Sequence, residues 1–298
     1  MSTEAKPFLK WAGGKGQLLP QLSERLPRRI YKESFTYIEP FVGGGAMLFY
    51  MLQRFGNIRK VVINDINEDL ILTYRTIRDD VEQLIARLEE LESRYFSIED
   101  EEGRRTLFYT IRDIYNQRQR DNVVRASQLI FLNKTCFNGL YRVNAKGLFN
   151  VPFGRYANPT ICNADLLRAD SRMLKSANIE ICQGDFSQIL EHAEGLTFVY
   201  LDPPYRPLDA TSSFTAYAKS DFNDDDQRKL AFFCSKLSDK GCLWMQSNAD
   251  CSAKNPEDTF FEELYKDYHI DRVLASRFIN ANPSKRGKLT ELLIMNYE

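Results

Sequence analysis

The stretch "SFTYIEPFVGGGAMLFYMLQRFGNIRKVVIND", Ser34 to Asp65, indicates the fold class. Its β-branched and aromatic start predicts a strand over Ser34–Phe41, and the three glycines after it predict a tight turn. The following apolar run predicts a helix that ends near Gly56, and Lys60–Asp65 is predicted as a second buried strand. A strand, a glycine turn, a helix and a strand form the first unit of a doubly wound α/β domain.

The rest of the chain predicts that this α/β pattern is interrupted and then resumes. Residues 66–79 and 81–132 favour helices, and "NAKG", 144–147, predicts a turn between two strands, Gly139–Val143 and Leu148–Pro152. The later strands are predicted at 178–186, 196–205, 241–248, 269–278 and 289–297. A further helix is predicted over 223–237, with Asn223 or Asp224 as its N-cap. The predicted fold is a doubly wound α/β sheet with an inserted helical and β-hairpin segment.

Charge distribution points to the kind of partner. The net charge is −1, but Arg118–Lys175 holds ten basic residues against three acids, and Arg272–Lys288 holds five against none. Basic segments that converge in space favour a polyanion such as nucleic acid, and ordinary solvated surface is the alternative.

Composition predicts a cytoplasmic protein with no metal site. The 298 residues contain no apolar run long enough to span a membrane, and the start of the chain lacks an apolar signal segment. The six cysteines are scattered without C-x-x-C spacing, as expected for buried thiols in a reducing compartment, and only two histidines are present.

Two glycine loops are candidates for cofactor binding. Asp65 lies about 20 residues after Gly45. In nucleotide-binding α/β domains an acid at this position accepts hydrogen bonds from ribose hydroxyls. Gly43 and Gly45 fit G-x-G-x-x-G but Leu48 replaces the third glycine, which favours an adenosine-containing cofactor other than a nicotinamide dinucleotide. The second loop, "FLKWAGGKG", lacks Walker A spacing. For both loops, a purely structural turn is the alternative.

The tetrapeptide "DPPY", Asp202 to Tyr205, is the most specific chemical signal. The amino group of a nucleic-acid base is a poor nucleophile because its lone pair is delocalised into the ring. Asp202 and the Pro203 carbonyl can each accept one amino hydrogen, and the two prolines hold that carbonyl rigidly. Tyr205 offers a face on which an extruded base can stack. The tetrapeptide therefore suits methyl transfer to a base amino group, and a strand-ending turn with a buried aromatic is the alternative.

Taken together, "FLKWAGGK", "EPFVGGG", "NDIN", "NGLYRVNAKGLFNVPFG" and "DPPY" resemble the Dam family of DNA adenine-N6 methyltransferases. The resemblance runs from Phe8 to the C-terminal "TELLIMNY" and implies a Rossmann-like methyltransferase sheet, with S-adenosylmethionine as methyl donor. It implies a catalytic role for Asp202, Pro203 and Tyr205. The residues that it implies for cofactor binding are Trp11, Lys15, Phe41, Gly43, Gly45, Asp65, Asp185 and Phe186.

The same resemblance implies a division of the chain and a surface that reads double-stranded DNA. Residues 1–75 and 166–298 correspond to the catalytic domain, and 76–165 to the target-recognition domain. Phe137 is similar to the family's intercalating aromatic, and Asn138 to the residue that supports the base left unpaired. Lys10 resembles the lysine that reads the first guanine of GATC. The other residues implied in reading GATC are Leu140, Arg142 and Pro152. The place of Arg142 beside Leu140 and across from Pro152 favours a guanine contact, and a phosphate contact is the alternative.

The sequence therefore predicts an S-adenosylmethionine-dependent enzyme that methylates adenine N6 in duplex DNA by base flipping, with GATC as the expected site. Alternatives are an RNA or protein-amide methyltransferase and a non-catalytic DNA-binding relative. A companion restriction endonuclease is a possible partner. The small and polar residues of 206–222 suggest a lid over the flipped base, with an ordinary surface loop as the alternative.

Overall fold

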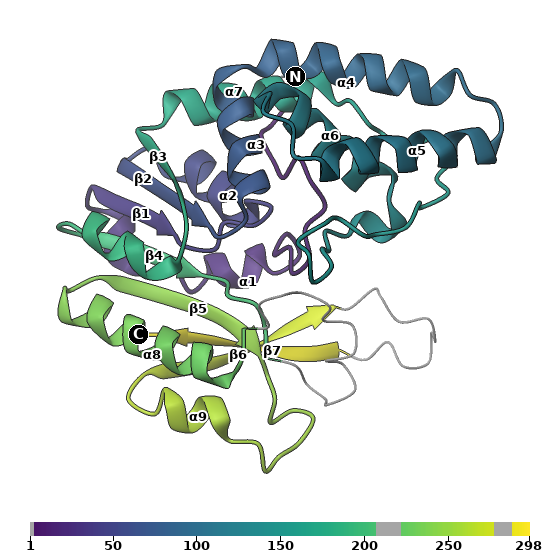
Figure 1. The fold of residues 1–298 in the computed structure, drawn as a ribbon. Coiled ribbons are helices and arrows are strands. Elements are labelled where there is room, and N and C mark those ends of the chain that lie inside the picture. Colours follow the sequence, from purple (N-terminus) through teal and green to yellow (C-terminus); the bar gives the residue numbers. More distant parts are fainter. Residues whose placement is uncertain (1–2, 207–221, 277–287) are drawn as a thin grey trace.

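The computed structural model describes residues 3–206, 222–276 and 288–298. Its centre is a seven-stranded sheet with the order β3-β2-β1-β4-β5-β7-β6 (Figure 1). The first five strands pair in parallel, and β7 pairs antiparallel with β5 and β6. The strands are β1 Phe35–Glu39, β2 Ile58–Asp65, β3 Ile179–Gln183, β4 Thr197–Leu201, β5 Leu243–Ala249, β6 His269–Ser276 and β7 Lys288–Met295. The predicted α/β sheet is confirmed.

Helices cover both faces of the sheet. Tyr37 of β1 belongs to one buried cluster and its neighbour Ile38 to the other, because successive side chains of a strand point to opposite faces. β4 is buried along its whole length and, with "TFVYL", is mostly apolar, because parallel strands are covered on both faces. The main helices are α1 Leu19–Ser23, α2 Ala46–Arg54, α3 Glu68–Asp79, α4 Val81–Phe96, α5 Glu101–Asn116, α6 Asn122–Thr135, α7 Ala164–Ser176, α8 Asp224–Asp239 and α9 Phe260–Leu264.

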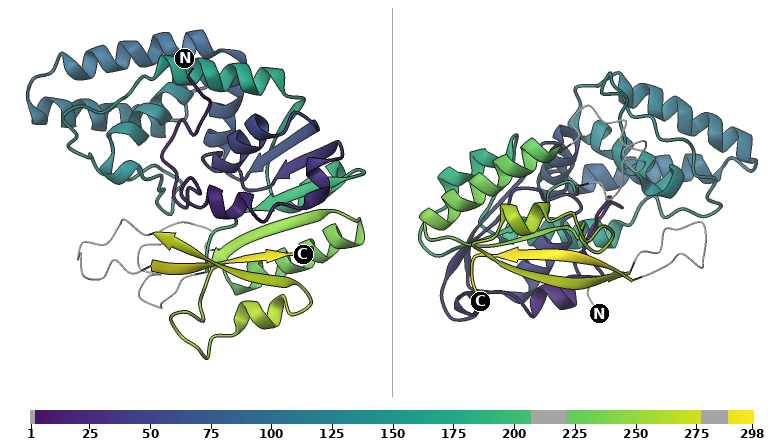
Figure 2. Two further views of the ribbon diagram at one scale, coloured as in Figure 1. Left: turned by 180° about the vertical axis from the view of Figure 1, so that it is seen from behind. Right: turned by 90° about the horizontal axis from the view of Figure 1, so that it is seen from below.

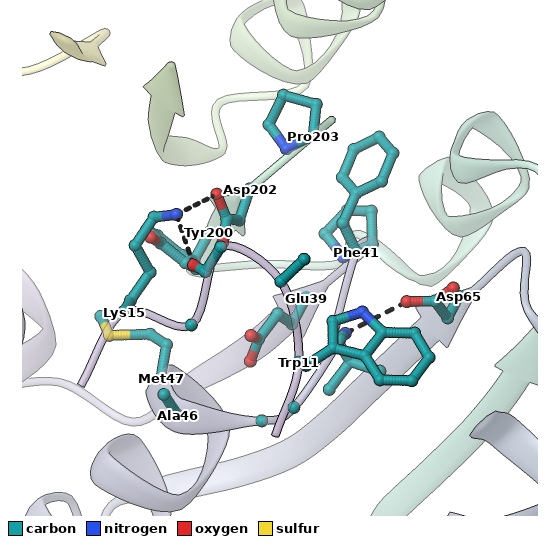
Figure 3. Close-up of a pocket in the computed structure, with 18 of the residues that line it drawn as sticks. Trp11, Lys15, Glu39, Phe41, Ala46, Met47, Asp65, Tyr200, Asp202 and Pro203 are labelled. Carbon is teal, nitrogen blue, oxygen red and sulfur yellow. Dashed lines mark hydrogen bonds and ion pairs between the residues drawn. The ribbon is translucent and has the colours of Figure 1, made fainter. Parts of the chain in front are cut away.

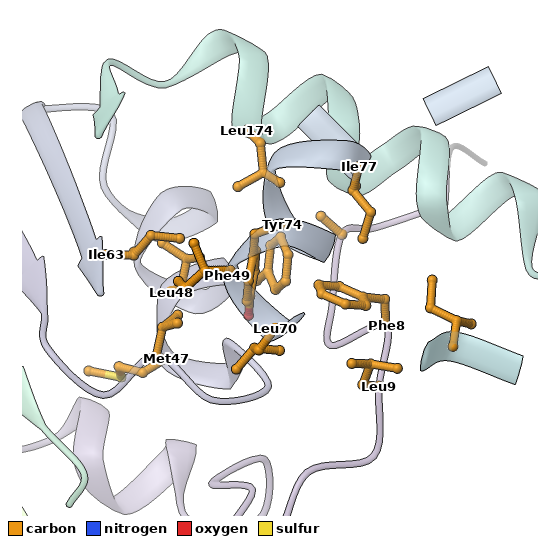
Figure 4. Packing of buried hydrophobic residues seen from close by; sticks show 14 of the residues in the cluster. Phe8, Leu9, Met47, Leu48, Phe49, Ile63, Leu70, Tyr74, Ile77 and Leu174 are labelled. Carbon is orange, nitrogen blue, oxygen red and sulfur yellow. The ribbon is translucent and has the colours of Figure 1, made fainter. Parts of the chain in front are cut away.

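The inserted helices α4, α5 and α6 extend to one side of the sheet, away from α8 and α9 (Figures 1 and 2). They share a continuous core with the sheet, because Leu84 of α4 and Phe131 of α6 belong to the same buried cluster as Tyr37. Part of this core is the edge-to-face pair of Phe8 and Tyr74, whose ring centroids lie 4.9 Å apart (Figure 4). The division at residues 75/76 and 165/166 stays a prediction.

The segment after α6 departs from the predicted strands. The turn at 144–147 is present, with the Gly147 N–H 2.8 Å from the Asn144 carbonyl oxygen and Gly147 at φ +73°. However, Gly139–Val143 and Leu148–Pro152 are not strands, and their pairing is limited to an isolated bridge between Val143 and Phe149. Side chains on two helices take backbone groups of both segments: Asn133 on α6 donates to the Gly139 carbonyl at 2.8 Å, and Asn116 on α5 bonds the N–H and the carbonyl of Phe149 at 2.8 and 3.1 Å.

No helix within residues 3–206, 222–276 and 288–298 combines the length and the apolarity that a bilayer span requires. The predicted lid and the basic loop 280–288 lie almost wholly outside the described residues.

Candidate active site

A cavity of about 1880 Å³ opens at the carboxyl ends of β1 and β4. It extends from the glycine loop after β1 to the start of residues 137–152, the segment that is predicted to contact DNA and is called the reading segment below. Its lining includes Asp65, Asp202 and Tyr205 together with Asn138 and Leu140. Figure 3 shows the first two of these with Trp11 and Lys15 around one space. The carboxyl edge of a parallel sheet is the usual ligand site in open α/β folds.

The glycine loop is tied to the acid at the end of β2. The N–H of Gly43 donates to Asp65 Oδ2 at 3.1 Å, and the N–H of Asn67 donates to Asp65 Oδ1 at 2.9 Å. Burial raises the pKa of Asp65, and these backbone N–H groups oppose that rise. Gly45 is required at φ +77°, since a Cβ there would collide with the hydroxyl of Tyr74. The loop and the acid therefore form one unit.

Aromatic rings flank this unit. The indole of Trp11 lies against Gly43, where an added Cβ would come within 3.0 Å of Trp11 Cδ1. The other indole face stacks on Tyr141, with centroids 5.2 Å apart. Phe41 and Phe186 have centroids 5.3 Å apart. The adjacent Asp185 is exposed, and its side chain accepts the N–H of Ser187 at 2.9 Å. All of the predicted cofactor residues line the cavity.

Asp202 leaves β4 and meets a buried lysine. Lys15 Nζ lies 2.7 Å from Asp202 Oδ1, 2.8 Å from the Gly13 carbonyl oxygen and 4.5 Å from the ring centroid of Tyr205 (Figure 3). The Lys15 side chain is 4% exposed and that of Asp202 20% exposed. Burial raises the pKa of Asp202, while the charge and hydrogen bond of Lys15 lower it. Lys15 was predicted as a cofactor residue, and its contact with the acid was not foreseen.

The turn after Asp202 is held by buried amides. Gln227 Nε2 donates to the Pro204 carbonyl at 3.2 Å, and Asn248 Nδ2 donates to Gln227 Oε1 at 3.1 Å. Both amide side chains are fully buried. Arg206 pairs with Asp224 at 2.8 Å and fixes the next residue of the chain. The turn is therefore fixed by contacts to α8 and β5 as well as by its two prolines.

Two acids in the cavity lining were missed from the sequence. Glu39 ends β1 and is 2% exposed, and the Tyr37 hydroxyl donates to its carboxylate at 2.8 Å. Burial holds the pKa of Glu39 well above its usual range. Glu291 on β7 accepts the hydroxyl of Tyr205 at 2.7 Å. The position of Glu39 immediately before "PFVGGG" was an available signal, whereas Glu291 reaches the site only through strand pairing.

The N-terminal loop and the reading segment are fastened together by Asn133. Its Oδ1 accepts the Lys10 N–H at 3.0 Å, and its Nδ2 donates to the carbonyls of Lys10 and Gly139, each at 2.8 Å. Asn138 takes a left-handed conformation at φ +56°. Phe137 beside it is 51% exposed. The arrangement presents Lys10, Phe137 and Asn138 at the cavity mouth and its rim.

Arg142 and Pro152 lie outside the cavity lining. The sequence predicted that Arg142 lies across from Pro152, but in the structure both its backbone and its side chain face Asn150. Arg142 Nε donates to Asn150 Oδ1 at 2.7 Å, and a terminal nitrogen lies 3.3 Å from the Asn150 carbonyl oxygen. Because an arginine carries five N–H donors, the outer edge of the guanidinium remains for another acceptor. Pro152 is exposed and Leu140 half-buried.

Among the described residues, one group brings three possible metal ligands within 4.8 Å of one another, namely Glu180, Cys182 and His192. Lys60 Nζ already lies 2.9 Å from Glu180 Oε2. None of these three residues lines the cavity, and the predicted absence of a metal stays a prediction.

The family model for D12 class N6 adenine-specific DNA methyltransferases matches residues 11–279. A type II methyltransferase of Methanocaldococcus jannaschii, M.MjaIII, is 50% identical over 298 residues, covering 99% of this chain and all of that relative. The type II methyltransferase M1.LlaDCHI of Lactococcus lactis is 39% identical, covering 98% of this chain and 95% of that relative. The DNA adenine methylase of Escherichia coli is 31% identical, with shares of 97% and 95%. The chain therefore belongs to the D12 class of N6 adenine-specific DNA methyltransferases.

Proposed function

We propose that this protein methylates adenine N6 within GATC of duplex DNA after the base has left the stack. The observation that carries the proposal is the single cavity that joins the glycine loop, Asp202 and the start of the reading segment. Its volume of about 1880 Å³ exceeds the roughly 300–1,000 Å³ of an ordinary small-molecule pocket. The cavity therefore has room for a cofactor and an extruded base together.

The residues around Asp65 suit S-adenosylmethionine. Asp65 is half-buried at the cavity wall, and each of its carboxylate oxygens, beside the backbone N–H that it accepts, retains lone-pair capacity for one hydroxyl of a ribose. Phe41 and Phe186, which contact each other, together offer an aromatic surface for one side of an adenine, and the open backbone of Gly43 permits close approach of the ligand. When bound, S-adenosylmethionine would supply an electrophilic methyl group.

The catalytic turn acts by accepting hydrogen bonds. Lys15 engages one oxygen of Asp202 and favours its charged form, which leaves the other oxygen to accept one hydrogen of the adenine amino group. The Pro203 carbonyl accepts the second hydrogen. Both bonds concentrate the lone pair on N6, and Tyr205 stacks against the base. The amine becomes acidic only after methylation, so Asp202 or water can then take the proton.

The likeness to a DNA adenine methylase supports GATC as the site. In this proposal Lys10 and Arg142 read guanines through O6 and N7, while Leu140 and Pro152 contact thymine methyls. Phe137 fills the gap left in the stack, and its exposure fits that role. Asn150 holds the guanidinium of Arg142 in place before DNA arrives.

The decisive experiment is to sequence duplex DNA that the purified protein has modified with S-adenosylmethionine. N6-methyladenine confined to GATC is the expected result, and a different sequence around the modified adenine would refute the GATC reading. Transfer of methyl groups to RNA or to a peptide, with no transfer to duplex DNA, would refute the proposal that duplex DNA is the substrate. Asp202→Ala should lower the rate by about 10²- to 10³-fold while leaving the fold intact.

A further inference from the structure

The phenol of Tyr205 is fastened by a residue from the far end of the chain. Its hydroxyl donates to Glu291 Oε2 at 2.7 Å, and Glu291 also lines the cavity. Glu291 lies on β7, where strand pairing sets it opposite Ala249 of β5 on one side and Val273 of β6 on the other. The acceptor therefore sits on a strand that is paired on both sides rather than on a loop.

We propose that Glu291 is a positioning residue for methyl transfer, which holds the ring of Tyr205 in the orientation that stacks on the extruded adenine. The inference rests on the function proposed above. It adds a residue outside the catalytic tetrapeptide, contributed by the antiparallel end of the sheet.

The geometry explains why such a support is needed. The two prolines fix the backbone before Tyr205, but they leave the two side-chain torsions of the tyrosine free. A bond at the hydroxyl fixes the ring at the end farthest from the backbone, and Lys15 contacts the ring 4.5 Å from its centroid. The ring is thus held at its tip and contacted by a cation before any base arrives.

A carboxylate at this position has a second effect. The charge of Glu291 contributes to the raised pKa of Asp202, although burial is the larger cause and Lys15 opposes it. Glutamine at position 291 would keep an oxygen that accepts the phenol and would remove the charge. Alanine would remove both. The two substitutions therefore separate ring positioning from electrostatics.

The test compares Glu291→Ala, Glu291→Gln and Tyr205→Phe in single-turnover methylation of a GATC duplex at saturating S-adenosylmethionine. Glu291→Ala should slow methylation by about 10- to 100-fold, the range that corresponds to loss of one hydrogen bond to a charged group. When 2-aminopurine replaces the target adenine, its fluorescence increases as the base leaves the stack. Glu291→Ala should reduce this increase. Combining it with Tyr205→Phe should add no further loss, because both changes remove the same bond.

Glu291→Gln should retain base extrusion and shift the acid limb of the rate profile to lower pH, which a merely structural residue would not do. Glu257→Gln is the matched control, since Glu257 is exposed, lies outside the cavity lining and should leave both readouts unchanged. Additive losses in the double variant, or wild-type rates in Glu291→Ala, would overturn the inference. A wild-type protein that leaves GATC duplexes unmethylated would instead refute the proposed function.

Discussion

Replacing Lys15 by methionine should raise the pKa of Asp202 and thereby move the pH dependence of methylation. The substitution removes an ammonium 2.7 Å from Asp202 Oδ1 while keeping an apolar side chain of similar length in a nearly closed site. A hydrogen bond between charged groups contributes about 1.5–3 kcal/mol, and one pKa unit corresponds to about 1.4 kcal/mol. The pKa of Asp202 should therefore rise by about 1–2 units.

The assay is the pH dependence of kcat/KM for a GATC duplex at saturating S-adenosylmethionine, because this ratio reports groups of the enzyme before DNA binds. In the wild type the acid limb should lie above the usual range of an aspartate, since burial raises the pKa of Asp202. In Lys15→Met that limb should move further up by about 1–2 pH units.

Lys236→Met is the control, because Lys236 lines the same cavity and its ammonium lies over the ring of Phe232. Its acid limb should stay in place. An unmoved limb in Lys15→Met, or one that moves to lower pH, would show that Lys15 does not set the charge of Asp202. A uniform loss of rate at every pH would assign Lys15 to substrate or cofactor binding alone.

Three further results are expected. Asp65→Ala should weaken S-adenosylmethionine binding by about 1.5–3 kcal/mol in calorimetry and leave DNA affinity nearly unchanged; equal cofactor affinity would reject Asp65 as the ribose ligand. Arg142→Ala should lose about 1–3 kcal/mol of discrimination at one base pair, which would be seen as methylation of near-cognate sites. A shallower salt dependence of DNA binding with an unchanged site preference would instead indicate a phosphate contact. Burial raises the pKa of Asp170 to about 8, so the folded protein keeps a proton that the unfolded chain releases near pH 4. The free energy of unfolding from urea titrations should therefore fall as pH rises from about 4 to about 8, and Asp170→Asn should remove much of that fall.

Local patterns in the sequence predicted the elements whose residues lie close together along the chain. The unit from Ser34 to Asp65 follows from its apolar runs and glycines, and Asn223 caps α8 as its side chain suggested. The ion pair of Lys15 with Asp202 and the bond of Tyr205 to Glu291 could not be predicted, because they depend on how the N-terminal loop and β7 are placed relative to the end of β4 in the folded protein.

The prediction of two strands in the reading segment was wrong for a different reason. Alternating residues on both sides of "NAKG" are typical of a two-stranded hairpin. This local pattern gives no information about contacts with Asn133, which lies on the preceding helix. The amide of Asn133 takes the Gly139 carbonyl from the side, so the backbone there bonds to a helix rather than to a facing strand. Asn116 on α5 likewise bonds the N–H and the carbonyl of Phe149, so side chains of two helices take backbone groups that the predicted strands would have paired with each other.

The continuous core has a consequence for how target specificity can evolve. Leu84, Phe108 and Phe131 from the inserted helices share one buried cluster with Tyr37 and Ile63 of the sheet. The protein should thus melt as one cooperative unit, and grafting the helices of a distant relative would break interdigitated packing in the catalytic half. Exposed positions such as Ala145 and Lys146 lie outside this core, so under the function proposed above new recognition sequences are more accessible there, where substitutions leave the common packing unchanged.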